Sequence, residues 1–410
     1  MKILFVHQNF PGQYKYLAPA LAQQGHEVTA LGMAERPSMP GIRYFRYGVQ
    51  RTSSKTTHPF AHDFETKVIR GEACLRAAAQ LAHQGYTPDL ICAHPGWGEP
   101  LFLKELWPHT RQLHYLEFYY RSTGQDVGFD PEFGKTVLSV QARLVAKNAN
   151  NLLNLSLMDA GICPTHWQFS TLPTEYQAKV QVIHDGIDAQ TVRPDPMATV
   201  TLIDDQNRSL TLTPRDKVIT YVGRNLEPFR GYHQFMRALP IVLRQHPTAK
   251  VVIIGGDGVS YGAPPASGTW KAQFLNEVIG QIDMSRVHFV GHLPYNKFIQ
   301  TLQCSTVHTY LTYPFVVSWS LLEAMSLGAT VVASDTAPVK EVIQHGENGW
   351  LVDFFQPESL ANQIIECLND TSRQLKIKQA ARETVLSRYD LTTHCLPQQM
   401  AWIQALLAQG

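Results

Sequence analysis

The stretch that decides the fold is Tyr310–Val352, YLTYPFVVSWSLLEAMSLGATVVASDTAPVKEVIQHGENGWLV. Apolar residues come in short blocks here: Val307–Leu311 predicts a strand, Ser318–Leu327 a helix, and Thr330–Ala333 a second, buried strand. The end of the stretch, 345–352, is bounded by glycines and predicts a hairpin. Strand, helix and strand in this order are typical of an α/β protein with a parallel sheet.

A polar turn opens the predicted helix at Ser318, Trp319 and Ser320. The first N–H groups of a helix have no partner inside the helix, so such a turn favours an anion. Glu323 follows within the next turn, where its carboxylate can face the same ligand. We therefore expect an anionic ligand at the start of this helix.

Length and composition indicate a globular protein of two domains. The chain has 410 residues, which is too long for one ordinary core, and 44% of them are hydrophobic while 17% are charged. A formal net charge of +1 gives no overall basic surface for nucleic acid. No apolar run approaches the roughly 20 residues that a membrane span requires. The opening MKILFVHQNF predicts a strand and not a signal peptide.

Six cysteines are scattered along the chain without a close pair. This spacing predicts neither a zinc cluster nor a disulfide framework, and it fits a reducing cytoplasm. They are Cys74, Cys92, Cys163, Cys304, Cys367 and Cys395.

The same alternation of strand and helix begins well before the central stretch. Val218–Val222, Val251–Ile254 and Val287–Val290 predict strands that each run into a glycine-containing loop. Arg224 and Arg230 lie on the first of these loops. Two cations on one strand-to-helix loop can converge on one anion, whereas a lone arginine would more often be a surface ion pair.

The first half of the chain has its own strand–helix–strand opening. Lys2–Val6 and Val28–Leu31 predict strands on either side of a helix, and Gly12 lies at the first strand-to-helix turn. A phosphate could approach backbone N–H groups at such a turn. A plain turn glycine is the alternative interpretation.

Polar side chains follow two further predicted strands, Asp89–Ala93 and Gln112–Leu116. His94 and Glu99 come after the first strand, and Glu117 comes after the second. Ligands of open α/β sheets bind beyond the carboxyl ends of the strands, so these three residues are the candidates in this half.

Three consecutive aromatic residues, Phe118, Tyr119 and Tyr120, follow Glu117. Beside a carboxylate they suit a sugar-binding wall, and they suit the edge of a core equally well.

The two strand–helix series are similar in size and divide near residue 190, where prolines mark a linker. Residues 198–214 predict a small hairpin, and 357–409 predict three helices. We predict two Rossmann-like domains that face one another across a cleft. The first domain is expected at 1–190 and the second at 191–385, with a last helix, 386–410, that returns to the first domain.

The chain resembles the family-4 glycosyltransferases, group-1 retaining enzymes of the GT-B fold. Six motifs of the second half carry the resemblance, and FVHQNFPGQ, GHEV and HDGID carry a looser one in the first half. The six are VGRNLEPFRG (222–231), IIGGDG (253–258), VHFVGHLP (287–294), WSLLEAMSLG (319–328), VVAS (331–334) and HGENGWLV (345–352).

The resemblance implies a nucleotide-sugar donor bound mostly on the second domain. Arg224 matches the family's first diphosphate-binding arginine, and Arg230 stands where the family usually has lysine. Glu323 matches a glutamate that accepts hydrogen bonds from the ribose hydroxyls. Phe315 stands where the family has the glutamate that touches the donor sugar, which leaves the sugar open. The expected donor-binding residues are Gly12, Arg224, Arg230, His292, Leu293, Ser318, Trp319, Ser320 and Glu323.

In the first domain the resemblance places Glu117 where the family often has a histidine beside the reacting carbon. The expected catalytic residues are Arg224, Arg230 and Glu117, and the expected acceptor residues are His94, Tyr119 and Tyr120. Retention implies substitution on the front face of the sugar, with the departing phosphate oxygen taking the acceptor proton. No Asp-x-Asp triplet occurs in the chain, so we expect no metal and no cofactor.

The expected function is that of a retaining, metal-independent hexosyltransferase. It moves a sugar from a nucleotide sugar, UDP- or GDP-linked, to a hydroxyl acceptor: a glycan, a glycolipid or a metabolite, as in polysaccharide biosynthesis. The alternatives are an epimerase or hydrolase on the same fold, and a non-catalytic nucleotide-sugar-binding protein. We expect a cytoplasmic protein with no nucleic-acid partner and at most weak, peripheral contact with the inner membrane surface.

Overall fold

The computed structural model describes residues 1–35 and 39–408. The chain forms two compact units. Unit 1 contains Met1–Gly128, Gly134–Gly186 and Thr392–Gly410, and unit 2 contains Phe129–Phe133 and Ile187–Leu391. The boundaries therefore lie a few residues from the predicted ones. Residues 129–133, expected in the first domain, fold instead as part of unit 2.

Unit 1 is built on a parallel sheet with the strand order β3-β2-β1-β4-β5-β6-β7 among the described residues. Its central strands are fully buried and rich in Ile, Leu, Val and Ala, as expected for a parallel sheet covered on both faces. The strands are β1 Lys2–Val6, β2 Glu27–Gly32, β3 Ile42–Arg46, β4 Leu90–Ala93, β5 Arg111–Tyr115, β6 Ala160–Cys163 and β7 Val180–Val182.

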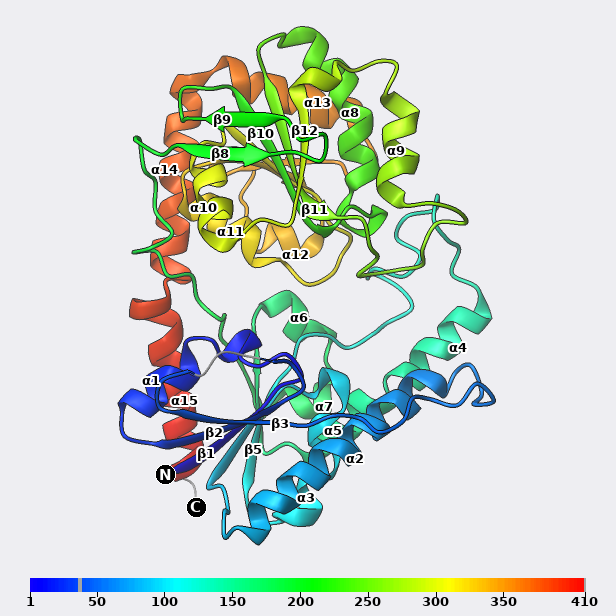
Figure 1. Cartoon of the computed structure of the whole chain (residues 1–410), viewed down its shortest axis with the longest axis vertical. Coiled ribbons are helices and arrows are strands. Elements are labelled where there is room, and N and C mark those ends of the chain that lie inside the picture. The colour runs from blue at the N-terminus through cyan, green and yellow to red at the C-terminus, as the bar shows by residue number, and fades with distance from the viewer. Residues whose placement is uncertain (36–38, 409–410) are drawn as a thin grey trace. The chain divides into compact units, whose positions relative to one another are not determined.

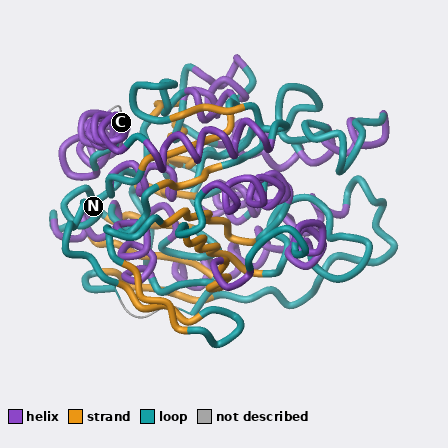
Figure 2. The backbone as a smooth tube through the Cα atoms, turned by 90° about the horizontal axis from the view of Figure 1, so that it is seen from above, coloured by secondary structure: helices purple, strands orange, loops and turns teal. Residues whose placement is uncertain are grey.

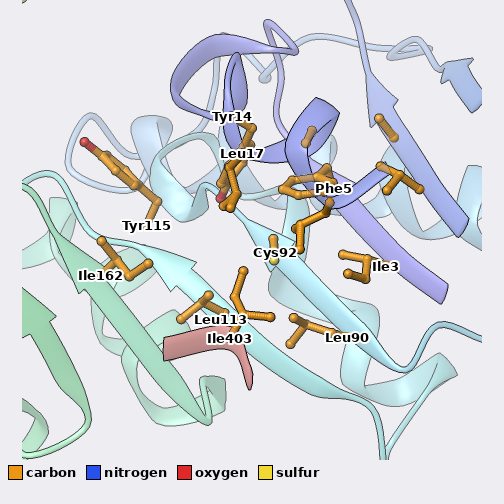
Figure 3. Packing of buried hydrophobic residues seen from close by; sticks show 14 of the residues in the cluster. Ile3, Phe5, Tyr14, Leu17, Leu90, Cys92, Leu113, Tyr115, Ile162 and Ile403 are labelled. Atoms are coloured by element: carbon orange, nitrogen blue, oxygen red, sulfur yellow. The ribbon is translucent and has the colours of Figure 1, made fainter. Parts of the chain in front are cut away.

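Helices pack on this sheet, and the last helix of the chain is one of them. In Figure 1 the red helix α15 lies beside the blue elements α1 and β1. Ile403 of α15 is 1% exposed and packs into the same core as Leu90 and Leu113 (Figure 3). This confirms the predicted return of the C-terminal helix. The helices of unit 1 are α1 Leu17–Gln23, α2 His62–His83, α3 Leu103–Leu106, α4 Leu138–Lys147, α5 Ala149–Leu157, α6 His166–Thr171, α7 Thr174–Gln177 and α15 Leu396–Ala408.

Unit 2 is built on a second parallel sheet, with the order β12-β11-β10-β13-β14-β15. The predicted hairpin near residue 200 is present as the antiparallel pair β8–β9. The strands are β8 Val200–Ile203, β9 Ser209–Leu212, β10 Val218–Asn225, β11 Lys250–Gly256, β12 Val287–Gly291, β13 Val307–Tyr310, β14 Thr330–Ser334 and β15 Trp350–Val352.

The prediction of a hairpin at 345–352 was wrong. Residues Trp350–Val352 form the edge strand β15, which pairs parallel with β14. The glycines at 346 and 349 shape the turn that leads into this strand. The helices of unit 2 are α8 Tyr232–Gln245, α9 Trp270–Val278, α10 Tyr295–Gln303, α11 Trp319–Ser326, α12 Ala337–Lys340, α13 Pro357–Asn369 and α14 Thr371–Arg388.

In each sheet, successive strands are added first on one side and then on the other side of a pair of adjacent strands. The point between these two strands is a topological switch point. In unit 1 the chain moves outward from β1 on one side and from β4 on the other, and in unit 2 from β10 and β13. Loops at such a point splay apart at the carboxyl ends of the strands and leave room for a ligand. The predicted α/β class and its two Rossmann-like units are confirmed.

Figure 2 shows the strands enclosed by helices and loops. Among the described residues, no helix has the length and apolar content that crossing a membrane would require.

Candidate active site

At the switch point of unit 2 lie the loops that follow β10 and β13. Asn225 at the end of β10 donates from Nδ2 to Ser260 Oγ at 2.7 Å and accepts from the Gly258 N–H at 3.1 Å. The loop after β11 is thereby fixed beside the loop after β10. A Cβ on Gly256 would lie 2.6 Å from His292 Nε2 and 2.8 Å from Asn225 Oδ1, so the glycine lets both side chains approach the end of β11.

Arg230 is enclosed: the residue is only 9% exposed. Its Nη1 donates to Thr312 Oγ1 at 2.8 Å and to the Val316 carbonyl at 3.1 Å. The guanidinium carbon lies 5.3 Å from the ring centroid of Tyr261 and 6.0 Å from that of Phe315. A buried cation needs such partners, since leaving one unpaired costs several kcal/mol. Arg230 therefore holds the loops after β10 and β13 together.

Arg224 is the opposite case. It is exposed, and its side chain makes no hydrogen bond or ion pair to any residue that the structure describes. It lies near the end of β10, at the switch point. A guanidinium that is not committed to the protein can bind an anion without first losing a partner.

Between the two arginines, Glu227 is fully buried. Its Oε2 accepts from the N–H groups of Ser260 and Tyr261 at 2.8 and 3.2 Å, which places the Tyr261 ring against Arg230. Burial raises the pKa of the Glu227 carboxyl, although these hydrogen bonds and the nearby arginines oppose the rise. Sequence reasoning missed Glu227, Tyr261 and Asn225.

The predicted anion-binding turn lies at the start of α11. Ser318 is the N-cap, and its Oγ accepts from the Ser320 N–H at 3.4 Å. The Ser318 N–H donates to Tyr310 Oη at 2.7 Å. Trp319 is 39% exposed, while Ser320 is buried. The positive end of the α11 dipole thus lies on the loop that also clamps Arg230.

Glu323 is buried one turn into α11, and its Oε1 accepts from Tyr295 Oη at 2.8 Å. Tyr295 begins α10 and is 45% exposed, so Glu323 is reached from the loop after β12. His292 on that loop is exposed and Leu293 half-buried. The predicted donor residues of the second half therefore lie on loops at one edge of one sheet.

Phe315, in place of the family's glutamate, is 8% exposed. Its ring packs edge-on against Phe229 at 4.9 Å and against Tyr261 at 5.1 Å. An aromatic wall beside Arg230 thus occupies the position where the resemblance implies a carboxylate.

At the switch point of unit 1, a hydrogen-bonded network joins residues that follow β1, β4 and β5. Gln13 Nε2 donates to Glu117 Oε1 at 2.6 Å, and Gln13 Oε1 lies 2.8 Å from His7 Nε2. His94 Nε2 lies 3.4 Å from Glu117 Oε2, an electrostatic contact that is too long for a well-formed hydrogen bond.

Backbone donors set the direction of this network. The Asn9 N–H donates to His7 Nδ1, and the Gly96 N–H donates to His94 Nδ1. In each neutral ring the proton must therefore lie on Nε2, which points toward Gln13 or Glu117. Both histidines are oriented as donors toward the carboxylate end of the network.

Glu117 is therefore held as an ionised acceptor. Burial would raise the pKa of its carboxyl, but His94, His7 and Gln13 outweigh this effect and hold the pKa below its usual value. About a third of the side chain, 34%, is open to solvent, so the carboxylate stays accessible. His7 and Gln13 were missed by sequence reasoning, although both flank the predicted turn at Gly12.

Gly12 supports this network through its own conformation. Its φ is +46°, and a Cβ there would lie 2.3 Å from the His7 ring. Glu99, by contrast, lies outside the network: it is fully buried and accepts from Tyr47 Oη at 3.0 Å. It is a core residue and not a candidate.

The predicted acceptor tyrosines have different surroundings. Tyr119 packs against the buried cluster that contains Leu116 and Met158. Tyr120 is covered by Lys147, whose Nζ lies 3.8 Å from the ring centroid. The structure thus brings His94 to Glu117, while Tyr119 lies at a core edge; an acceptor role for either tyrosine stays a prediction.

Two family models match the chain. The model described as "Glycosyl transferase family 4 group" matches residues 24–192, and the one described as "Glycosyl transferases group 1" matches 203–384. The chain belongs to the group 1 glycosyltransferases. Among curated relatives, this glycosyltransferase is 25% identical over 209 residues to "D-inositol 3-phosphate glycosyltransferase" of Corynebacterium urealyticum. That match covers 50% of this chain and 47% of the relative, about half the length of each.

Solved structures share the fold over its whole length. A sucrose-phosphate synthase from Thermosynechococcus elongatus superposes with a TM-score of 0.72 at 19% identity and covers 100% of both chains. Anabaena HepE in complex with UDP-glucose superposes with a TM-score of 0.68 at 16% identity and covers 99% of both. At these sequence identities the structural likeness shows only that this glycosyltransferase has the GT-B fold.

Proposed function

We propose that this chain transfers a hexosyl group from a nucleoside diphosphate sugar to a hydroxyl group of an acceptor. The observation that carries the proposal is the set of groups at the switch point of unit 2: the uncommitted Arg224, the enclosed Arg230 and the Ser318 end of α11. The relatives support the same chemistry, since one is named a glycosyltransferase and one solved structure holds UDP-glucose.

These groups suit a diphosphate that leaves during the reaction. Negative charge builds up on the phosphate as the bond to the sugar breaks. Cations and a helix N-terminus beside the leaving phosphate stabilise that charge more strongly than they stabilise the intact donor, and this difference lowers the barrier. Glu323 supplies an acceptor-only carboxylate for the ribose hydroxyls.

Glu117 is the proposed catalytic carboxylate of unit 1. A carboxylate held ionised can orient an acceptor hydroxyl or stabilise positive charge that develops on the sugar. We propose retention of configuration, with the departing phosphate oxygen taking the acceptor proton. The hydrogen bond from Gln13 and the contact with His94 support this role, because they favour the charged form of Glu117.

We further propose that no metal ion takes part. The chain has no Asp-x-Asp triplet. Among the described residues, one group has metal-ligand spacing: Asp130, Glu132 and His233. Proton donors already occupy it, because Arg237 binds both Glu132 oxygens at 2.7 and 2.8 Å and His233 lies 3.0 Å from Asp130 Oδ2.

The test is a thermal-shift panel with UDP, GDP and ADP and their glucose or mannose conjugates, in EDTA. A ligand that binds the folded state raises its melting temperature with occupancy. Arg224→Ala is the better probe, since Arg230→Ala would also break contacts inside the protein. The matched control is Arg215→Ala, another exposed arginine of unit 2.

We expect one nucleotide to stabilise the wild type and Arg215→Ala in EDTA, and Arg224→Ala to lose most of that shift. The panel is repeated with a divalent metal ion in place of EDTA. If no nucleotide stabilises the wild type under either condition, the proposal is wrong. A shift that needs the metal ion would overturn metal independence alone. Turnover with acceptors then separates a transferase from an epimerase, a hydrolase or a binding protein.

A further inference from the structure

Five residues from the first half of the chain fold as part of unit 2. We call Phe129–Phe133 the strap; the residues on either side, Gly128 and Gly134, belong to unit 1. The loop that carries the strap is closed at its base. Gly128 has a φ of +72°, and a Cβ there would overlap the Thr136 hydroxyl, so the two arms of the loop lie against each other.

The strap is anchored by a buried carboxylate. Asp130 is 4% exposed, and its Oδ2 accepts from Tyr313 Oη at 3.0 Å and lies 3.0 Å from Nε2 of the fully buried His233. Burial would raise the pKa of the Asp130 carboxyl, but the hydrogen bond from His233 brings it below its usual value. The buried carboxylate is compensated by these two partners, and both belong to unit 2.

Aromatic side chains hold both ends of the strap. The Phe129 ring lies 5.1 Å from that of Tyr313 and 5.2 Å from that of Phe354. The Phe133 ring lies 5.3 Å from Trp270. Contacts of this kind stabilise a core beyond the area they bury. The strap is thus part of the aromatic core of unit 2.

A continuous series of contacts leads from the strap to the candidate donor site. The Tyr313 N–H donates to the Phe229 carbonyl at 3.1 Å, and the two rings lie 4.9 Å apart. Phe229 precedes Arg230 and packs on Phe315. Thr312, which precedes Tyr313, accepts from Arg230. The residue that Asp130 holds is therefore part of the loop that clamps Arg230.

We propose that Asp130 and Tyr313 are positioning residues, and that the strap fixes the loops that hold Arg230 for nucleotide binding. The proposal rests on the proposed function for the identity of the ligand. The claim that the strap fixes the two loops does not depend on that function. Unit 2, which is proposed to bind the nucleotide, is thus completed by a segment from the first half of the sequence.

The test compares full-length Asp130→Asn, Tyr313→Phe, the double variant and Glu132→Gln. Tyr313→Phe removes only the hydroxyl and keeps the ring, so it covers the case in which Asp130→Asn fails to fold. Glu132→Gln is the matched control, since it weakens the ion pair of the strap with Arg237 and does not contact Tyr313. Hydrogen exchange at peptides covering 223–231 and 312–316 is measured, together with titration of UDP, GDP and ADP.

Asp130→Asn and Tyr313→Phe should each speed exchange in both peptides and weaken nucleotide binding about tenfold, as expected for losing a hydrogen bond to a buried charge. Because Tyr313 acts through its contact with Asp130, the double variant should be no worse than Asp130→Asn, which also weakens the contact with His233. Glu132→Gln should resemble the wild type. Unchanged exchange in Tyr313→Phe, or fully additive effects, would overturn the proposal.

A wild type that binds none of the three nucleotides would contradict the proposed function. Exchange at 223–231 and 312–316 would still decide whether the strap fixes these loops.

Discussion

Glu117 and Arg230 are both surrounded by partners, but the partners have different consequences. Arg230 is 9% exposed, and its Nη1 donates to Thr312 and to the Val316 carbonyl. Glu117, in contrast, keeps about a third of its side chain, 34%, open to solvent. A group that is fixed and still accessible is suited to act on a substrate. Arg230 holds the loops after β10 and β13 in place, whereas Glu117 in unit 1 and Arg224 in unit 2 each keep exposed surface.

Glu117→Gln tests this assignment at a single residue. The variant keeps the size of the side chain and removes the charge that Gln13 and His94 favour. We expect turnover of the donor to fall by roughly two orders of magnitude, the typical effect of removing one electrostatic group from an active site, while nucleotide affinity stays unchanged. Steady-state kinetics and nucleotide titration measure the two effects. Glu105→Gln, an exposed carboxylate of unit 1, is the control; equal turnover in both variants would rule out the catalytic role.

Sequence position made Glu117 and Arg224 candidates because each comes after a predicted strand; Arg224 in fact lies at the end of β10. It missed Gln13 because its contact with Glu117 joins residues 104 positions apart, and no local pattern encodes such a pair. It missed Glu227 for a different reason, because the residue type alone does not show whether a glutamate is buried or exposed. Its role became visible only with the Ser260 and Tyr261 N–H groups in place.

At the scale of elements, apolar periodicity predicted the parallel strands of both sheets and the β8–β9 hairpin. It failed at β15, where the three residues that follow Gly349 form an edge strand and not a hairpin. A strand this short has too few residues to show a period. Pairing with β14, a property of the whole sheet, decides its conformation.

The turn of the β8–β9 hairpin is tied to unit 2 by Asp204. Its Oδ2 accepts from Arg208 Nε at 2.7 Å and lies 2.9 Å from His288 Nδ1. Burial opposes ionisation, but the hydrogen bonds from Arg208 lower the pKa of Asp204 to about 2.

Because this folded-state pKa lies below the unfolded value near 3.9, the stabilisation is complete above about pH 5 and is lost as pH falls toward 2. We expect Asp204→Asn to cost about 2 kcal/mol at pH 7. Its deficit in melting temperature should shrink between pH 5 and pH 2.5. Asp205→Asn, in an exposed ion pair with Lys271, should show a small deficit. A deficit for Asp204→Asn that does not change with pH would contradict the prediction.

At the scale of the whole molecule, the sequence predicted two Rossmann-like domains but assigned each to one continuous stretch. The chain instead passes from one unit to the other at Gly128, at Gly134, at Gly186 and again at Leu391. The sequence did not predict the strap, because a segment of five residues is too short to show a strand or helix pattern that would assign it to a domain. What places them is the fit of Asp130 to side chains a hundred and more positions away.

Thermodynamic linkage makes the strap a reporter of nucleotide binding. If the strap stabilises the loops that bind the nucleotide, then the bound nucleotide must stabilise the strap by the same free energy. We therefore expect the nucleotide that binds best to slow hydrogen exchange in 129–133 as well as in 223–231. The protection should end at Gly128 and Gly134, where the chain enters unit 1.

Helix α4, outside the strap, and the β8–β9 hairpin serve as internal controls. Protection of 223–231 without protection of 129–133 would show that the strap only fills space in unit 2. Protection of both in the wild type, and of 223–231 alone in Tyr313→Phe, would identify the Tyr313 hydroxyl as the link that couples them.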